Sequence, residues 1–110
     1  MKDTYILGIE SSCDETSCSI VKNGNKEINT VILSQIDIHT LYGGVVPEIA
    51  SRNHVKDVVF VIDKCLKESK LTMNDISAIA VTHGPGLVGS LLVGLEAAKT
   101  LADIYDKPLV

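Results

Sequence analysis

The sequence predicts one α/β domain with the element order strand, strand, strand, helix, strand, helix, strand (βββαβαβ). Two observations predict it: short β-branched runs separated by turn residues come first, and apolar positions recur at the helical period farther along. The chain has 110 residues, of which 45% are hydrophobic. A domain of this size buries roughly 65% of the surface that its unfolded chain exposes, so it can form one compact core without disulfides or a structural metal.

The first three strands are expected at residues 4–9, 17–22 and 28–33. A polar, side-chain-rich turn over residues 10–16 separates the first two strands. Asn23-Gly24-Asn25 joins the second strand to the third, because Asn and Gly tolerate the positive φ angles of tight hairpin turns. The three strands are therefore predicted to form an antiparallel meander.

A helix is expected to begin at Pro47 and to end at about Ser69. Phe60 lies nearly opposite its main apolar face, so the apolar surface continues most of the way round the helix. Either one face packs on the sheet and the other meets a partner, or the helix is enclosed within a larger fold. The main face consists of Val55, Val58, Val59, Ile62, Cys65 and Leu66.

A buried strand is expected at 76–81, a loop at 82–86 and a second helix from about Leu87 to Tyr105. Along that helix small residues recur every four positions, and such a stripe lets another backbone approach closely. The stripe consists of Ser90, Gly94, Ala98 and Ala102. Residues 108–110 resemble the start of a further strand, so the sequence is expected to be a truncated piece of a longer protein.

Charge and composition weigh against several functions. Ten Lys and Arg against fourteen Asp and Glu give a net charge of -4, and only 4% of the residues are aromatic, which argues against a basic, base-stacking RNA surface in this chain. The first apolar run stops at Glu10, too soon for a signal peptide or a membrane span. Cys13, Cys18 and Cys65 cannot all pair and are expected to be free thiols, which favours a cytoplasmic protein.

The first motif, Gly8-Ile-Glu-Ser-Ser-Cys-Asp-Glu-Thr16, ends a strand with carboxylates and hydroxyls. Ser11 and Ser12, together with backbone N–H groups, could cradle phosphate oxygens. The carboxylates could hold a hydrated Mg²⁺ or orient a substrate amine. The alternative is a solvated hairpin whose side chains only bond the turn backbone. The carboxylates are Glu10, Asp14 and Glu15.

Two further motifs flank the predicted helices. In Tyr42-Gly-Gly-Val-Val-Pro-Glu-Ile-Ala-Ser-Arg-Asn-His54, Glu48 suits the helix dipole and Arg52 lies one turn farther, available to an anion or to Glu48 itself. In 83–90, glycines join a buried strand to a helix, where free N–H groups attract anions. The alternative for the first of these two motifs is a helix-entry loop in which Glu48 only stabilises the first turn. The three histidines, His39, His54 and His83, show no metal-binding spacing and are expected to be structural.

Taken together, segments 8–16, 39–54 and 84–94 resemble the TsaD family, also labelled Gcp or glycoprotease. The resemblance covers the whole chain but only about the first third of a family member. It implies that residues 1–110 are the N-terminal lobe of an actin-like ATPase (ASKHA, ribonuclease H-like) fold, a half that the element order also resembles. The second lobe and the metal-ligand segment would be absent.

The resemblance implies a tRNA threonylcarbamoyltransferase. Such an enzyme transfers the threonylcarbamoyl group from threonylcarbamoyl-adenylate to the adenosine beside the anticodon. Asp14 and Glu15 are expected to be catalytic. One divalent metal, of the iron or zinc class, is implied for the full-length protein with all its ligands outside this chain, so the fragment alone is expected to be metal-free and inactive. The implied substrate-binding and nucleotide-binding residues are Glu10, Ser11, Ser12, Glu48, Arg52, His83, Gly84 and Gly86.

The implied partners are tRNA, a TsaE-like ATPase and a TsaB-like paralogue, with no membrane. We expect the paralogue to dock on the Phe60 side of the first helix and on the stripe Ser90/Gly94/Ala98, surfaces that could instead support a homodimer. The rival functions are a non-catalytic TsaB-like scaffold and the metal-dependent glycoprotein endopeptidase of the family's other label. A sugar or acetate kinase would usually carry Asp in place of Glu10.

Overall fold

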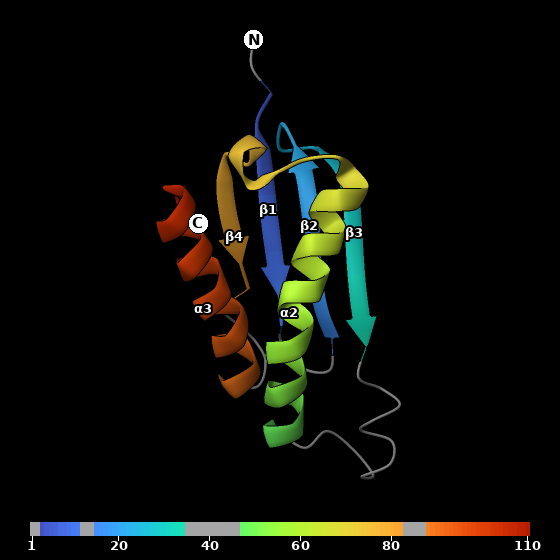
Figure 1. Cartoon of the computed structure of the whole chain (residues 1–110), viewed down its shortest axis with the longest axis vertical. Helices are drawn as coiled ribbons and strands as arrows, with labels where there is room; N and C mark the ends of the chain where they lie inside the picture. The colour runs from blue at the N-terminus through green and yellow to red at the C-terminus, as the bar shows by residue number, and fades with distance from the viewer. Residues whose placement is uncertain (1–2, 12–14, 35–46, 83–87) are drawn as a thin grey trace.

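The computed structural model describes residues 3–11, 15–34, 47–82 and 88–110, with the backbone alone described at 47–56 and 88–90. It is an α/β structure in which two long helices pack on a mixed sheet (Figure 1). The sheet order is β3-β2-β1-β4. The elements are β1 (Tyr5–Glu10), β2 (Glu15–Lys22), β3 (Lys26–Ser34), α2 (Pro47–Ser69), a 3-10 turn (Met73–Asp75), β4 (Ala78–Val81) and α3 (Val88–Tyr105).

The predicted antiparallel meander of β1, β2 and β3 is confirmed. At its hairpin Asn23 and Gly24 have φ angles of 53° and 75°, the left-handed conformation that the Asn-Gly pair predicted. Asn23 also fixes the start of β1, because its Oδ1 accepts the Thr4 N–H at 2.9 Å. This end of the sheet is therefore stabilised by the turn conformation of Asn23 and Gly24 and by the hydrogen bond between Asn23 and Thr4.

Strand β4 joins the meander by pairing in parallel with β1. Beyond β4, the Val110 N–H donates to the Ile79 carbonyl at 2.7 Å, and the Ile79 N–H donates to the Pro108 carbonyl at 2.9 Å. Ile79 thus forms a parallel bridge with Leu109. The predicted start of a further strand at 108–110 is confirmed to this extent, and it lies on the outer edge of β4.

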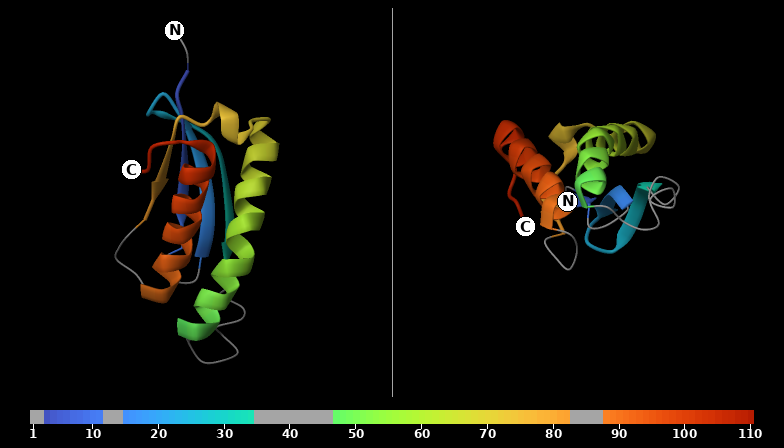
Figure 2. Two further views of the ribbon diagram at one scale, coloured as in Figure 1. Left: turned by 60° about the vertical axis from the view of Figure 1, so that its left-hand side comes forward. Right: turned by 90° about the horizontal axis from the view of Figure 1, so that it is seen from below.

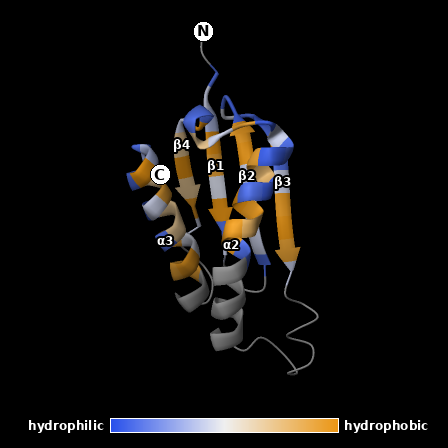
Figure 3. Ribbon diagram, viewed as in Figure 1, coloured by the Kyte–Doolittle hydropathy of each residue, from blue (hydrophilic) through white to orange (hydrophobic). Residues whose placement is uncertain are grey.

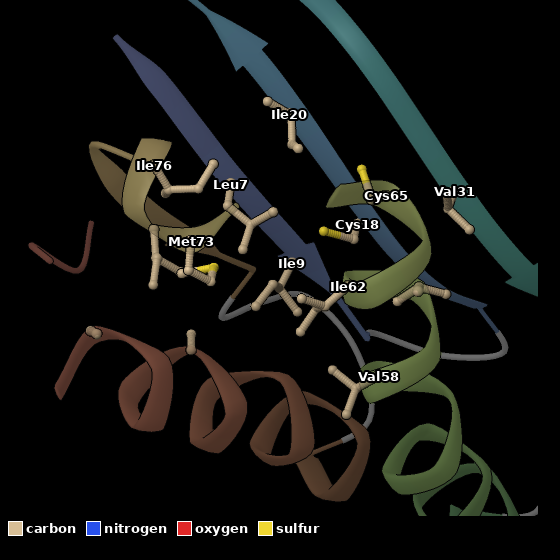
Figure 4. Packing of buried hydrophobic residues seen from close by; sticks show 14 residues of the cluster. Leu7, Ile9, Cys18, Ile20, Val31, Val58, Ile62, Cys65, Met73 and Ile76 are labelled. Atoms are coloured by element: carbon tan, nitrogen blue, oxygen red, sulfur yellow. The ribbon is translucent and has the colours of Figure 1, made fainter. Parts of the chain in front are cut away.

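Both helices cover the same face of the sheet, α2 over β2 and β3 and α3 over β4 and β1 (Figure 2). The strands carry mainly hydrophobic residues, whereas the hairpin and the last turns of α2 are hydrophilic (Figure 3). Side chains at alternate strand positions point between the sheet and the helices, where they meet the inner face of α2 (Figure 4). The core includes Leu7, Ile9, Cys18, Ile20, Val31, Val58, Val61, Ile62, Cys65, Ile76 and Ile79.

The packed face of α2 differs from the predicted one by part of a turn. Val58, Ile62 and Cys65 are buried as expected, but Val61 is also fully buried and Val59 is 68% exposed. The assignment of Val59 to the packed face was wrong, because the face centres on the line from Val58 to Cys65 and Val59 lies about 100° away from Val58.

Phe60 is 49% exposed on the side of α2 turned away from the sheet, as its helical position predicted. The ammonium of Lys64 lies 5.7 Å from the centre of its ring. This is within the range of a cation–π contact between residues one helical turn apart. Part of the exposed ring is therefore shielded by a neighbour on the same helix.

The small-residue stripe of α3 faces the chain's own sheet. Ala98 is fully buried, Ala102 is 9% exposed, and Gly94 lies against Ser11 and Ile9 of the β1 segment. The predicted close approach of another backbone is confirmed, but the use of this stripe as a surface for a partner protein is wrong for Gly94 and Ala98. A helix without side-chain bulk can sit close to the strand that it covers, and here that strand is β1.

Two smaller findings complete the fold. The 3-10 turn Met73–Asp75, which the sequence did not predict, is held by a capping box in which the Asp75 carboxylate accepts the Thr72 N–H at 2.8 Å. Buried Met73 contributes to the core from this turn. No helix in the described part of the chain is long and apolar enough to cross a membrane.

Candidate functional site

The described strand and helix ends that flank the segments singled out in the sequence gather at one end of the sheet. Strand β1 ends at Glu10, β2 begins at Glu15 and β4 ends at Val81, while α2 begins at Pro47 and α3 at Val88. These element ends lie together at the end of the molecule opposite the β2–β3 hairpin (Figures 1 and 2). In open α/β sheets ligands bind outside the carboxyl ends of the parallel strands, and β1 and β4 are the parallel pair here. The topology therefore favours this end as the site.

The structure describes only part of the predicted residue set. Glu48 and Arg52 belong to the first turns of α2, and nothing is described of their side chains. Glu10, Ser11 and Glu15 are described with their side chains. The remaining predicted residues lie outside the described part of the chain, namely Ser12, Asp14, His83, Gly84 and Gly86.

Glu10 lies on the sheet face opposite the helices, beside a hollow of about 300 Å³. Ser17 is its register partner on β2, and Thr82 lines the hollow from the end of β4. The Thr82 N–H donates to the Ile9 carbonyl at 3.1 Å, which extends the β1–β4 pairing to the edge of the sheet. A half-buried carboxylate and two hydroxyl-bearing residues are thus gathered at one end of the sheet.

This arrangement can position a polar ligand. A carboxylate accepts hydrogen bonds and hydroxyls both donate and accept, so the hollow suits an amine or a hydroxyl group. Glu15, at the start of β2, is exposed, and its register partner on β3 is Ser34. Among the described residues no cluster of three or more His, Cys, Asp or Glu side chains could hold a metal ion.

Ser11 points to the other side of the sheet from Glu10. It is 1% exposed, and its Oγ accepts a hydrogen bond from the Gly94 N–H of α3 at 2.9 Å. The phosphate contact predicted for Ser11 remains a prediction, whereas the contact that the structure describes is with a helix backbone. The sequence reasoning did not place Gly94 near the site; the small-residue stripe was the signal that could have done so.

A second surface lies on the outer side of the helix pair. Between α2 and α3 there is a groove of about 810 Å³. Val59 of α2 and Leu92 of α3 both line it and are 68% and 49% exposed. Exposed apolar side chains gathered along one groove are typical of a protein interaction surface. This groove is separate from the carboxyl end of the parallel strands.

Comparison with known proteins adds a family match and a fold match. The family model described as "TsaD: tRNA N6-adenosine threonylcarbamoyltransferase" matches residues 26–110. The curated proteins of that name from Listeria monocytogenes serotype 4b (strain CLIP80459) and Staphylococcus haemolyticus (strain JCSC1435) are 61% and 57% identical over 109 residues. Those residues are 99% of this chain and 32% of each relative, so the chain spans about a third of their length.

Among solved structures, "YeaZ from Pseudomonas aeruginosa" superposes with a TM-score of 0.70 at 16% sequence identity. The superposition covers 97% of this chain and 42% of that chain. A likeness at this identity concerns the fold alone, and it supports the predicted α/β, ASKHA-type architecture.

Proposed function

The chain belongs to the TsaD family, and from that premise we propose that it is the N-terminal lobe of a tRNA N6-adenosine threonylcarbamoyltransferase. The whole protein would transfer the threonylcarbamoyl group from threonylcarbamoyl-adenylate to the adenosine beside the anticodon of a tRNA. The observation that carries the proposal is the family match over residues 26–110, and the gathering of the described ends of β1, β2, β4, α2 and α3 at one end of the sheet supports it. We also infer a cytoplasmic location, since the proposed substrate is a tRNA and the cysteines are expected to be free thiols.

The reaction is an acyl transfer. The exocyclic amine of adenosine attacks the carbamoyl carbon, the bond from that carbon to the phosphate oxygen breaks, adenylate leaves, and the amine nitrogen loses one proton. Because the mixed anhydride already has a good leaving group, the protein mainly has to hold the two substrates in line and to exclude water. Strand-end carboxylates such as Glu10 and Glu15 are suited to this task.

We assign roles within that edge by chemistry. Asp14 and Glu15 would act as the catalytic carboxylates, orienting the amine and accepting its proton. Glu10, beside the hollow at the end of β1, would bind the substrate amine or hydroxyl groups. The other assigned residues would bind the adenylate, whose phosphate would contact the Arg52 guanidinium and the backbone N–H groups of the glycines. They are Ser12, Glu48, Arg52, His83, Gly84 and Gly86.

The family resemblance also implies a divalent metal, whose ligands it assigns to the part of the protein beyond residue 110. The described residues offer no ligand cluster that fits such an ion. No step described for this lobe therefore runs through the metal. The groups that this chain would contribute to the reaction are carboxylates, hydroxyls and backbone N–H groups.

We further propose that the groove between α2 and α3 binds a TsaB-type paralogue. Val59 and Leu92 support the proposal, since both are exposed apolar residues in one groove. A partner with the same fold would present an equivalent helix pair, and two such pairs can pack together as a four-helix layer. Phe60 would contribute from the neighbouring side of α2, in place of the stripe that packs inward. Binding of a second copy of this chain, or of a TsaE-like ATPase, would be a separate event.

The alternative functions are a non-catalytic scaffold of the TsaB type and the metal-dependent endopeptidase of the family's other label. A scaffold would not need the carboxylates of residues 14 and 15. The full-length gene separates the transferase from the scaffold: an H-x-x-x-H motif shortly after residue 110 supports the transferase, and its absence supports the scaffold.

The test is transfer by the full-length protein. Incubated with tRNA, a TsaB-type partner and labelled threonylcarbamoyl-adenylate, it should yield threonylcarbamoyladenosine, whereas residues 1–110 alone should yield none above a control without protein. Glu15→Gln should lower the rate at least tenfold, and the exposed carboxylate variant Asp103→Asn, at the far end of α3, should not. Absence of product from the full-length protein, or turnover by residues 1–110 alone, would contradict the proposal.

A further inference from the structure

The end of β1 and the middle of α3 meet at a polar contact inside the molecule. Ser11 is 1% exposed, and the Gly94 N–H donates to its Oγ at 2.9 Å across 83 residues of sequence. Gly94 lies inside α3, where its N–H also has a helical acceptor four residues earlier, so the Ser11 hydroxyl is a second acceptor for this N–H. Ser11 is thus bound to the helix and turned away from the face that carries Glu10.

A glycine is needed at position 94 because there is no room there for a side chain. A Cβ added to Gly94 would lie 2.4 Å from Ser11 Oγ, a distance at which atoms overlap. Its next neighbours would be Ser11 Cβ at 3.4 Å and Ile9 Cγ2 at 3.6 Å, which are ordinary contacts. The overlap therefore comes from the hydroxyl oxygen alone, and the close approach of α3 to β1 depends on the pair of residues rather than on either one.

The contact joins the two chain segments that lead into the candidate loops. Ser11 is followed directly by residues 12–14, and α3, on which Gly94 lies, is preceded directly by residues 83–87. On the other side of that second loop, the Thr82 N–H is bonded to the Ile9 carbonyl at 3.1 Å. Thr82, which precedes residues 83–87, and Gly94, which follows them within α3, are thus both hydrogen-bonded to the end of the β1 segment.

We propose that Ser11 and Gly94 form a joint that fixes the end of β1 against the middle of α3. Ser11 is then a positioning residue that acts through α3, in place of the phosphate ligand that the sequence suggested. The proposal rests on the proposed function for its catalytic consequence, since Asp14 follows Ser11 closely in the sequence and the predicted adenylate-binding glycines precede α3. Its structural part is independent of that function.

The structural part is tested by a double-mutant cycle in the full-length protein. Gly94→Ala should lower the melting temperature by several degrees, because the new methyl group overlaps Ser11 Oγ. Adding Ser11→Ala to it should recover part of that loss, because the nearest atom is then 3.4 Å away. Gly8→Ala is the matched control for melting temperature, since its Cβ would have no neighbour nearer than Ser19 O at 3.9 Å. Additive losses in the cycle would overturn the joint.

The positioning role is tested by measuring kcat and KM of the Ser11→Ala and Ser11→Thr variants at a temperature below both of their melting temperatures. If Ser11 acts by fixing the end of β1 against α3, Ser11→Ala should lower kcat at least tenfold with little change in the KM for threonylcarbamoyl-adenylate. Ser11→Thr, which keeps the hydroxyl, should retain most of kcat. A rise in that KM with kcat unchanged would instead mean a direct ligand contact and would overturn the proposal. If the unmodified enzyme shows no transfer, the proposed function fails, while the melting cycle still tests the joint.

Discussion

Replacing one isoleucine on each face of the sheet tests which face is the core. Ile79 of β4 is fully buried beneath the helices, whereas Ile32 of β3 is 55% exposed on the face without helices. Truncating a fully buried isoleucine to alanine costs about 2–5 kcal/mol, since both the transfer energy and a cavity contribute. The half-exposed side chain loses roughly half of the 1.5–3 kcal/mol that full burial provides, or about 1 kcal/mol.

The assay is urea unfolding of residues 1–110 followed by far-UV circular dichroism, which suits a protein without tryptophan. Ile79→Ala should lower the free energy of unfolding by at least about 2 kcal/mol and Ile32→Ala by about 1 kcal/mol, with similar denaturant slopes. In a domain of this size each kcal/mol corresponds to roughly 4–8 °C in melting temperature, so heating would separate the two variants as well. Equal losses, or a larger loss for Ile32→Ala, would refute the assignment of the helix-covered face as the core.

Three further outcomes are expected. Val59→Asp should weaken capture of a TsaB-type partner by the full-length protein at least tenfold. Ile104→Asp is the control, because Ile104 is equally exposed at 68% but does not line the groove, and it should leave capture unchanged. Equal weakening by both variants would contradict the groove as the docking site. Cys18 should resist alkylation until the chain unfolds, because its hydrogen bond with Cys65 and its burial raise the pKa of its thiol. Alkylation of Cys18 in the native protein would show that this region of the core is open to reagent. Gly24→Ala should cost about 1 kcal/mol in urea unfolding because the turn requires a φ of 75°, and a neutral effect would mean that the turn can change type.

The parts of the fold that follow from local chemistry were predictable from the sequence. The Asn23-Gly24 turn fixes the pairing of β2 with β3 through the φ angles that it allows. Pro47 begins α2, as a proline at a first helical turn should. The parallel addition of β4 beside β1 agrees with the α/β class, because a strand reached through a long helix crosses over to pair in parallel.

The predictions that were wrong concern which part of the protein each helix face packs against. The apolar periodicity of α2 shows that the helix has a packed face but does not fix which residues lie at the middle of that face. Val59 is therefore wrongly assigned to the packed face, and the buried Val61 is missed. The stripe of α3 predicted close approach correctly, yet a small residue such as Ala98 does not specify whether its neighbour is another protein or the chain's own sheet. Such choices are made by tertiary packing, and no local pattern encodes them.

The candidate site remains a prediction, and the described part of the structure adds only that the strand and helix ends flanking the three motifs lie at one end of the sheet. The sequence could not separate the roles of adjacent residues. Glu10 and Ser11 are neighbours in a motif, but they point to opposite faces of the sheet, one beside a hollow and the other against Gly94. Only the direction of each side chain distinguishes a ligand-facing residue from one that holds a helix.

The most direct test of the account is hydrogen exchange of the full-length protein with and without threonylcarbamoyl-adenylate. If the ligand binds at the carboxyl ends of β1 and β4, protection should increase in peptides spanning residues 10–17 and 82–94 and should not change in the β2–β3 hairpin at residues 22–26. Protection confined to the hairpin end, or no change in any peptide of this lobe at saturating ligand, would contradict the claim that these residues form one side of the transferase site.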